Sequence, residues 1–341
     1  MRRTGPTSSR ATAGRAAVLT AGALLAGGVV AGLLTAVPGS TSSGAARAAS
    51  GPHVAGCPVL PADNYWNTDI SDLPVDPHSR AWLSHMSTDR DLHPDFGPSY
   101  GDGPNYGMPV TVVSGAHHKV PVRFRYADES DRVRYPFGPD TLIEGGRGSE
   151  GDKHAVVVDK THCRLFETWD TTVRDGDWRA GSGATWSLRS DDLRPDGWTS
   201  ADAAGLPILP GLLRWREVRD GSVTHAVRFT TDLTAPKHLW PARHDAGTAH
   251  GKGYPPMGAR FRLRASFPTD DYSRHARTVI RAFKHYGLVL ADNGSPWYFQ
   301  GERNAHWPDR LVEELKSIPA SAFVAVDTSA LDHGPDSGQV R

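Results

Sequence analysis

Two side chains in neighbouring predicted strands have the chemistry of an acid–base pair. His154 begins the run His154–Asp159 (HAVVVD), and Glu167 lies in the run Cys163–Trp169 (CRLFETW). These runs predict a β-hairpin whose turn is centred between residues 160 and 161. A turn of two or of four residues about that centre places His154 directly opposite Glu167, with Cβ atoms about 5 Å apart. The carboxylate would then orient the imidazole for general acid or base catalysis. The alternative is a polar pair on a half-solvated sheet.

A second predicted hairpin carries an imidazole and a guanidinium on opposite faces. Its strands are Leu212–Val218 and Val223–Thr230, and Asp220-Gly221 between them is a strong two-residue turn signal. His225 shares its face with apolar residues, and a buried imidazole requires a hydrogen-bond partner. Arg228 lies on the other face, where it would bind an acidic group or form a structural ion pair.

A third imidazole lies in a loop rich in Trp, Pro and Gly. Arg243 and His244 belong to the loop Lys237–Gly258, and binding residues concentrate in such loops. Because isolated polar groups in apolar settings are costly unless they are partnered or used, we predict that His154, His225 and His244 border one concave surface. Their imidazoles would then lie within about 12 Å of one another.

The predicted catalytic and binding groups favour carbohydrate chemistry. The chain has ten tryptophans, and flat aromatic faces with polar rims suit sugar rings, although at least half of them are expected to fill the core. Asp292 lies in a turn (DNGS) and joins the site only if that turn opens into the same cleft. The predicted catalytic residues are His154, Glu167, His225 and His244. The predicted substrate-binding residues are Arg228, Arg243, Trp198, Trp240 and Asp292.

Short signatures of known chemistry are missing from the sequence. There is no GxSxG, HExxH or Walker A pattern, and no Cys/His spacing of a zinc site. We therefore predict no cofactor. A divalent metal held by some of His154, Glu167, His225 and His244 is the alternative.

The N-terminus has the features of an export signal. Four arginines precede an apolar run from Ala16 to about Val37, and Ala46-Arg47-Ala48 is an A-x-A cleavage pattern. We predict a signal peptide over 1–48, a linker over 49–56, one domain over 57–330 and a loose tail over 331–341. The alternative is a retained anchor, since the apolar run is long enough to span a bilayer.

Charge and cysteine content restrict the partners and the compartment. The chain has 38 basic and 38 acidic residues, and residues 1–48 carry five arginines and no acid, so cleavage leaves acids in excess by five. This balance argues against nucleic acid or an anionic membrane as the partner. In an exported protein, two cysteines predict one disulfide, here Cys57–Cys163. Two buried free thiols are the alternative.

The remaining patterns predict a β-rich domain, all-β or α+β. Short strands alternate with Gly/Pro-rich loops, and the best helix is Ser273–Tyr286, with shorter ones near Asp76–Met86 and Pro308–Ser317. There is no internal repeat. The expected architecture is a single antiparallel sandwich or open barrel with a few peripheral helices.

Several long segments resemble a family of exported, largely uncharacterised bacterial proteins. The resemblance spans Cys57 to Val326 and implies a single exported domain. The family has no established activity, so it transfers no catalytic residue. The segments are LPADNYWNTDI (60–70), GDKHAVVVDKTHCRLFE (151–167), TSADAAGLPILPGLL (199–213), THAVRFT (224–230), PPMGARFRL (255–263) and YGLVLADNGS (286–295).

These observations favour a secreted enzyme that acts on an extracellular polysaccharide. A carboxylate pair would hydrolyse the glycosidic bond. A His base beside an Arg that neutralises a uronic acid would instead cleave it by β-elimination. The alternative functions are a non-catalytic glycan- or cell-wall-binding module and a purely structural surface protein. We expect a monomer whose partner is a glycan, with no nucleic acid and no membrane bound after signal cleavage.

Overall fold

The computed structural model describes residues 51–101, 105–251 and 253–341, which belong to one compact unit. The predicted signal peptide lies outside the described residues, as do residues 49 and 50 of the predicted linker. The described chain is β-rich, with 28% strand and 16% helix in four sheets, and these sheets do not close into a barrel. The predicted fold class is therefore confirmed.

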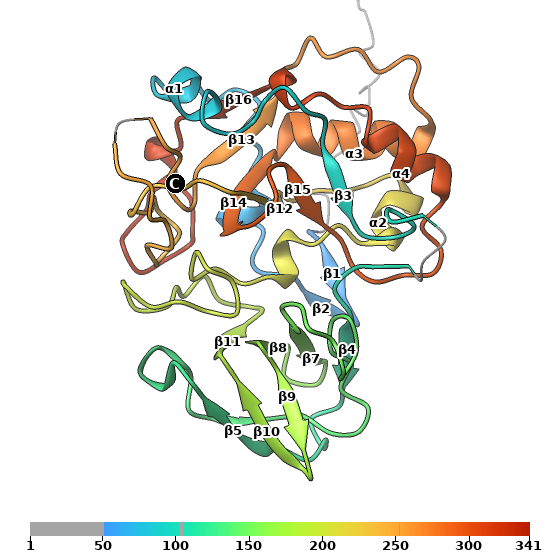
Figure 1. The fold of residues 1–341 in the computed structure, drawn as a ribbon, viewed down its shortest axis with the longest axis vertical. Helices are drawn as coiled ribbons and strands as arrows, with labels where there is room; N and C mark the ends of the chain where they lie inside the picture. Colours follow the sequence, from blue (N-terminus) through green and yellow to red (C-terminus); the bar gives the residue numbers. More distant parts are fainter. Residues whose placement is uncertain (1–50, 102–104, 252) are drawn as a thin grey trace, which may run out of the picture. The chain divides into compact units, whose positions relative to one another are not determined.

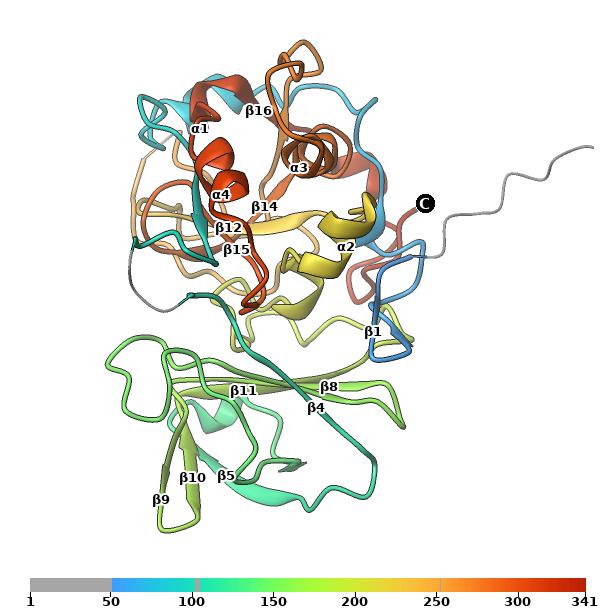
Figure 2. The same cartoon turned by 90° about the vertical axis from the view of Figure 1, so that its right-hand side faces the viewer.

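Two four-stranded sheets pack face to face as a sandwich, in the lower part of Figures 1 and 2. Aromatic side chains fill the space between them, among them Tyr135, Phe166 and Trp178. The first sheet has the order β11 (Ser182–Ser187), β8 (Arg164–Trp169), β7 (Ala155–Asp159), β4 (Val110–Val113); the second has the order β6 (Arg134–Tyr135), β5 (Val120–Phe124), β10 (Asp177–Ala180), β9 (Thr172–Arg174).

Strand β7 is buried on both faces. Successive side chains of a strand point to opposite sides, so Ala155 and Val157 enter the sandwich core, while Val156 and Val158 enter a second core on the other face. That second core also contains Cys57 and Cys163. Their predicted disulfide is confirmed, with a Cα–Cα distance of 5.4 Å.

The third large sheet has six strands and holds the main core, in the upper part of Figures 1 and 2. Helices α1 (Ser79–Leu83), α3 (Arg274–His285) and α4 (Asp309–Leu315) contact this sheet or one another. The strand order is β16 (Phe323–Val326), β13 (Arg260–Leu263), β14 (Leu288–Asn293), β12 (Val227–Thr231), β15 (Tyr298–Gln300), β3 (His93–Asp95).

Helix α3 forms where its sequence pattern predicts it. The Ser273 hydroxyl accepts a hydrogen bond from the Ala276 amide and caps the helix. An apolar stripe that includes Val279 and Phe283 is buried. Gly287, with a φ of 70°, follows the helix in a conformation that glycine adopts without strain.

Smaller elements complete the described chain. The fourth sheet is a pair of two-residue strands, one inside the predicted linker and the other at the start of the predicted domain. The remaining bounds are β1 (His53–Val54), β2 (Cys57–Pro58), η1 (Tyr65–Asn67), η2 (Ala127–Glu129), η3 (Leu209–Gly211), α2 (Trp215–Asp220), η4 (Ala320–Ala322) and η5 (Ser329–Leu331). No helix in the described ranges is both long enough and apolar enough to cross a membrane.

The predicted hairpin around Asp220-Gly221 is wrong. Its first half contains the helix α2, and Gly221 is the C-cap, with a φ of 82°. Glycine in the left-handed region suits a tight hairpin turn and a helix C-terminus equally well. The sheets are also mixed rather than antiparallel, because β12 runs parallel to β14 and β4 parallel to β7.

The register predicted for the first hairpin is also wrong. Val156, not His154, is opposite Glu167. The connecting residues are 160–163, with Cys163 at a φ of 50°, so the turn is centred one residue later than predicted. Moving the centre by one residue moves each pairing by two. Each side chain therefore keeps its face and changes its partner.

The last residues of the chain, expected to be loose, are held against the domain. The Trp240 indole N–H donates to the Ser337 carbonyl at 2.9 Å, and Val340 donates to the Asp63 carbonyl at 2.9 Å. Asp332 and Val340 form an antiparallel bridge. These contacts add the tail to the domain.

Candidate active site

A cavity of about 330 Å³ collects charged side chains from the six-stranded sheet and the sandwich. Arg228 and Asp292 reach it from the neighbouring strands β12 and β14, and Asp95 from β3. Glu144 and His154 reach it from the segment that leads into β7. The other lining residues are Tyr100, Tyr106, Met108, Asp152, Thr230, Asn293, Gly294, Ser295, Tyr298 and Gln300.

A β-bulge turns Asp292 toward this cavity. Phe229 pairs with Leu290, but Thr230 pairs with Asp292, so Ala291 is an extra residue in β14. In a regular strand, Asp292 would point to the same side as Leu290, which is in the apolar core. The bulge places it instead on the side of Thr230, which lines the cavity. A single inserted residue thus makes a polar site from a core strand.

His154 and Glu144 form a buried ion pair in the cavity wall. The Nδ1–H of His154 donates to Glu144 Oε2 at 2.6 Å, and Tyr106 donates its hydroxyl to Glu144 Oε1 at 2.9 Å. Burial lowers the pKa of His154, but the charge and the hydrogen bond of Glu144 together outweigh burial and raise this pKa to about 8. Burial acts to raise the pKa of Glu144, but His154 and Tyr106 hold it at about 2. The pair is therefore charged at neutral pH.

The other nitrogen of His154 is free to meet a ligand. Its Nε2 is buried, and no group in the described part of the chain hydrogen-bonds to it. The Oε1 of Gln300, another buried atom of the cavity lining, likewise has no partner among the described residues. Unpaired buried polar atoms are costly, and at a cavity wall a bound molecule can satisfy them. A protonated Nε2 offers a donor, and Gln300 offers an acceptor.

Arg228 lies between two carboxyl groups. Its Nε donates to Asp202 at 3.1 Å, and its Nη2 lies 3.6 Å from Asp292. Burial and the nearby Asp202 raise the pKa of Asp292 to about 7, although Arg228 opposes this shift. Burial also raises the pKa of Asp202. One cation thus serves a fully buried acid, Asp202, and a partly exposed one, Asp292, and the latter titrates near neutral pH at the cavity.

A further carboxyl group in the cavity also resists ionisation. Burial raises the pKa of Asp95, and the charge of Glu144 adds to this effect, while a hydrogen bond from the Tyr100 hydroxyl opposes it. The cavity thus contains one acid that is firmly ionised, Glu144, and two whose pKa is raised, Asp95 and Asp292. Such splitting of the pKa values of neighbouring groups is characteristic of acid–base sites.

Three of the four residues predicted to be catalytic lie outside this cavity. The Glu167 carboxylate accepts hydrogen bonds from the backbone N–H groups of Ile208 and Leu209, both at 2.9 Å, and so holds the start of η3. Burial raises its pKa to about 7, although these two hydrogen bonds oppose the shift. His225 donates to Glu217 at 3.1 Å and to the Ala226 carbonyl at 2.7 Å. Its two ring nitrogens are thereby satisfied within the fold.

His244 is likewise engaged elsewhere. Its Nδ1 donates to the Ala203 carbonyl at 2.8 Å, and its Nε2 lies 4.0 Å from a Glu129 oxygen. Of the three imidazoles predicted to share a surface, His154 alone lines the charged cavity. The structure therefore does not bring His154, His225 and His244 into one pocket.

The predicted binding residues separate into two groups. Arg228 and Asp292 line the charged cavity, and Arg243, Trp198 and Trp240 do not. Arg243 donates to the Asp336 carboxylate at 3.0 Å and so binds the C-terminal segment. Trp198 packs under a guanidinium, with Arg194 Cζ 5.4 Å from its ring centre.

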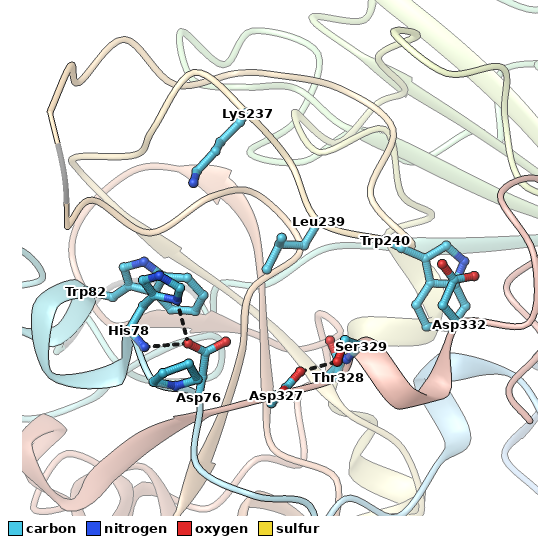
Figure 3. A pocket seen from close by; sticks show the side chains of 11 residues that line it. Asp76, His78, Trp82, Lys237, Leu239, Trp240, Asp327, Thr328, Ser329 and Asp332 are labelled. Carbon is cyan, nitrogen blue, oxygen red and sulfur yellow. Dashed lines mark hydrogen bonds and ion pairs between the residues drawn. The ribbon is translucent and has the colours of Figure 1, made fainter.

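Trp240 lines a larger cavity of about 410 Å³ (Figure 3). His78 stacks on Trp82 at one side of this cavity, while Trp240 and Asp332 lie at the other. The His78 side chain is 68% exposed and pairs with Asp76, so this imidazole remains solvated. Size alone would favour this cavity, but the buried, interacting charges of an acid–base site are in the smaller one.

Sequence patterns missed Asp95, Glu144 and Asp202. Asp95 and Glu144 come from loop-rich stretches in which no periodicity marks one acid among several. Asp202 has the sequence position of an acid in the first turn of a short helix capped by Thr199 or Ser200. The packing of Asp202 against the buried Arg228 has no local signal.

Metal binding has no ready site in the described ranges, which contain no group of three or more His, Cys, Asp or Glu side chains placed to hold an ion. Comparison with known proteins adds nothing further to the argument: no family model, curated protein or solved structure matches this chain. The chemistry of the cavity itself must therefore indicate the function.

Proposed function

We propose that the protein is an exported glycoside hydrolase whose catalytic site is the Glu144–His154 cavity. The observation that carries this proposal is the unpartnered Nε2 of His154 in the wall of a cavity where the pKa of Asp292 is raised to about 7. Hydrolysis of a glycoside requires a proton donor and a second acidic group that activates water or attacks the sugar. The disulfide is in keeping with an extracellular location.

Each charged group has a distinct part in the proposed reaction. Asp292, protonated up to about neutral pH, donates its proton to the oxygen of the leaving sugar as the glycosidic bond breaks. A water molecule attacks the sugar carbon, and Asp95 accepts the water proton in its ionised form, which the hydrogen bond from the Tyr100 hydroxyl favours. His154, kept protonated by Glu144, donates a hydrogen bond from Nε2 to a substrate oxygen.

Strand spacing favours inversion over retention. Strands β12 and β15 separate the strands of Asp292 and Asp95. Three strand spacings put their backbones roughly 14 Å apart. Side chains converging from that distance leave room for a water molecule, as in inverting enzymes, whose carboxyl groups lie ~6.5–9.5 Å apart.

The charges in the cavity favour hydrolysis over β-elimination. Elimination requires a cation that neutralises a uronate carboxylate. Arg228 is 2% exposed and already pairs with Asp202 and Asp292. The lining contains four carboxyl groups against Arg228 and His154. Even with Asp292 protonated, three carboxyl groups face two cations, so an anionic sugar would meet net repulsion.

The test is turnover on a panel of polysaccharides with three readouts. Polymers of neutral sugars, of amino sugars and of uronic acids are each incubated with the protein in which the Cys57–Cys163 disulfide is intact. New reducing ends, ultraviolet absorbance of unsaturated uronates, and the anomeric configuration of the first product are recorded. We expect reducing ends without unsaturated product, and inversion.

Matched variants connect turnover to the cavity. His154→Gln and Asp292→Asn are expected to lower kcat by ~10²–10⁴-fold. His285→Gln, which removes a 45% exposed imidazole paired with Asp69, is the control and should leave kcat unchanged. Unsaturated products would identify a lyase, and glycan binding without turnover would identify a binding module.

A further inference from the structure

A second cavity, of about 200 Å³, adjoins the catalytic one. Asp152, Asp292 and Asn293 line both cavities, so one wall is common to the two. A ligand that fills the first cavity and extends past this wall therefore enters the second. The other residues that line the second cavity are Tyr126, Trp169, Ser182, Thr199, Ser200, Ala201, Asp202 and Ala203.

Two aromatic rings form one side of the second cavity. Tyr126 and Trp169 stack with ring centres 6.3 Å apart and an interplanar angle of 26°. The Trp169 indole N–H donates to Asp152 at 3.3 Å, which connects this side to the common wall. Tyr126 is 48% exposed, so it has surface available for contact. Paired aromatic faces beside polar groups provide a platform for a sugar ring.

The buried face of the second cavity ends in an unsatisfied acceptor. Asp202 is fully buried, and its Oδ1 has no hydrogen-bond partner in the described part of the chain. Its other oxygen accepts from Arg228. Gln300 Oε1 is the corresponding free acceptor in the catalytic cavity. Both cavities thus present buried oxygen atoms that require a donor.

Carboxyl groups outnumber cations along the two cavities. The cations of the lining are Arg228 and His154, and the nearby Lys153 and Arg125 pair with Asp170 instead. Arg125 also lies over the Tyr126 and Trp169 rings, at 5.1 and 5.2 Å from their centres. The carboxyl groups of the lining are Asp95, Glu144, Asp152, Asp202 and Asp292.

We propose that the two cavities form one groove for a polymer of free amino sugars, with neighbouring units in the catalytic cavity and on the Tyr126–Trp169 platform. An ammonium group carries three donors and no acceptor, which matches a groove whose carboxyl groups outnumber its cations and whose buried oxygen atoms include free acceptors. The sugar hydroxyls supply further donors. This assignment of substrate rests on the proposed hydrolase function. The groove is also expected to bind amino-sugar oligomers when no turnover occurs, so binding can be tested separately.

The test measures binding of short oligomers to the His154→Gln protein by calorimetry. The probes are β-1,4-linked glucosamine oligomers of two and four units, the N-acetylated oligomers of the same lengths, and oligogalacturonate. The glucosamine tetramer is expected to bind at least tenfold more tightly than its acetylated counterpart, and this preference should shrink as salt increases. Oligogalacturonate should bind most weakly.

Two substitutions locate the second position. Tyr126→Ala should weaken binding of the glucosamine tetramer by roughly tenfold, because only the longer chain reaches the platform, and should leave the dimer unchanged. Tyr254→Ala, a half-buried tyrosine stacked on His85 and outside both cavities, is the control. Asp152→Asn should reduce the preference for amino over acetylated oligomers.

The outcomes separate the groove from the reaction. Equal affinity for amino and acetylated oligomers overturns the charge argument, and equal loss for dimer and tetramer in Tyr126→Ala overturns the second position. Turnover of a neutral polymer but not of the glucosamine polymer refutes this inference and leaves the hydrolase standing. Tight, length-dependent binding of glucosamine oligomers without wild-type turnover supports the groove and refutes the hydrolase.

Discussion

Replacing Glu144 with glutamine removes the charge that holds His154 protonated. The two side chains form a buried pair at 2.6 Å, and the charge and hydrogen bond of Glu144 together overcome burial and raise the pKa of His154 to about 8. Glutamine keeps the size of the side chain and an acceptor oxygen but has no charge. Burial and the Arg228 charge then both lower the pKa of His154, with Asp152 a weaker opposing charge, so we expect this pKa to fall below its ordinary value of 6.5.

The size of the effect follows from that shift. A rise from 6.5 to about 8 corresponds to about 2 kcal/mol of folding stability. Because the folded pKa of this histidine is raised, the contribution is complete below about pH 6.5 and is lost as pH rises through about 8. The lowered pKa of Glu144 reports the same ion pair, so the two contributions to stability are not added. Because the folded pKa of this acid is lowered, the stability of the pair is also lost in acid, as pH falls from 4.5 toward about 2.

Two assays test this reasoning. Imidazole resonances of labelled protein are titrated by NMR, with His154→Gln used to assign the signal, and urea unfolding is measured at pH 5.5, 7 and 9. Glu144→Gln should cost about 2 kcal/mol at pH 5.5 and much less at pH 9. Asp69→Asn, which removes the exposed partner of His285, is the control. A wild-type His154 that titrates below 6.5, or one whose pKa is unchanged in the variant, would refute the argument.

Three further substitutions probe the fold around the site. Cys57→Ser opens a loop that spans 106 residues to Cys163 and should lower unfolding free energy by up to about 4–5 kcal/mol in urea; a loss under about 1 kcal/mol would contradict this. Arg228→Met leaves the buried Asp202 beside Asp292 without a cation, so about 3–5 kcal/mol should be lost at pH 8 and less at pH 5, where carboxyl groups can protonate; equal loss at both pH values would count against it. Burial raises the pKa of Glu167 to about 7, so its ionisation costs about 3 kcal/mol between pH 4.5 and 7. Glu167→Gln should therefore flatten the stability profile over that interval, and a profile parallel to the wild type would show the assignment to be wrong.

The first hairpin illustrates how far local patterns reach. The run from Ala155 to Asp159 identifies a buried strand, and alternation assigns its faces correctly. The pairing of Glu167 failed because a turn centred one residue later satisfies the same alternation. Partner choice across a ladder depends on the conformation of the turn, here with Cys163 at positive φ, and two flanking hydrophobic runs do not specify it.

The residue Gly221 shows a different limit. An Asp-Gly pair between two apolar runs predicts a hairpin, yet here it ends the helix α2. A left-handed glycine has the same local conformation in both settings. What separates them is whether the preceding residues pack as a strand or as a helix, and α2 packs against α3, more than fifty residues further along the chain.

The sequence by itself determined the β-rich class, the capped helix α3 and the Cys57–Cys163 disulfide. Each rests on a local period, a capping residue or a count. Only the tertiary structure decided the composition of the charged cavity, where Asp95, Glu144, His154, Arg228 and Asp292 meet from four separate segments. Their pKa values arise from burial and from neighbours distant in the chain, and the bulge at Ala291 that aims Asp292 inward depends on pairing between β12 and β14. Burial, distant neighbours and strand pairing all result from long-range packing, and local sequence patterns do not predict them.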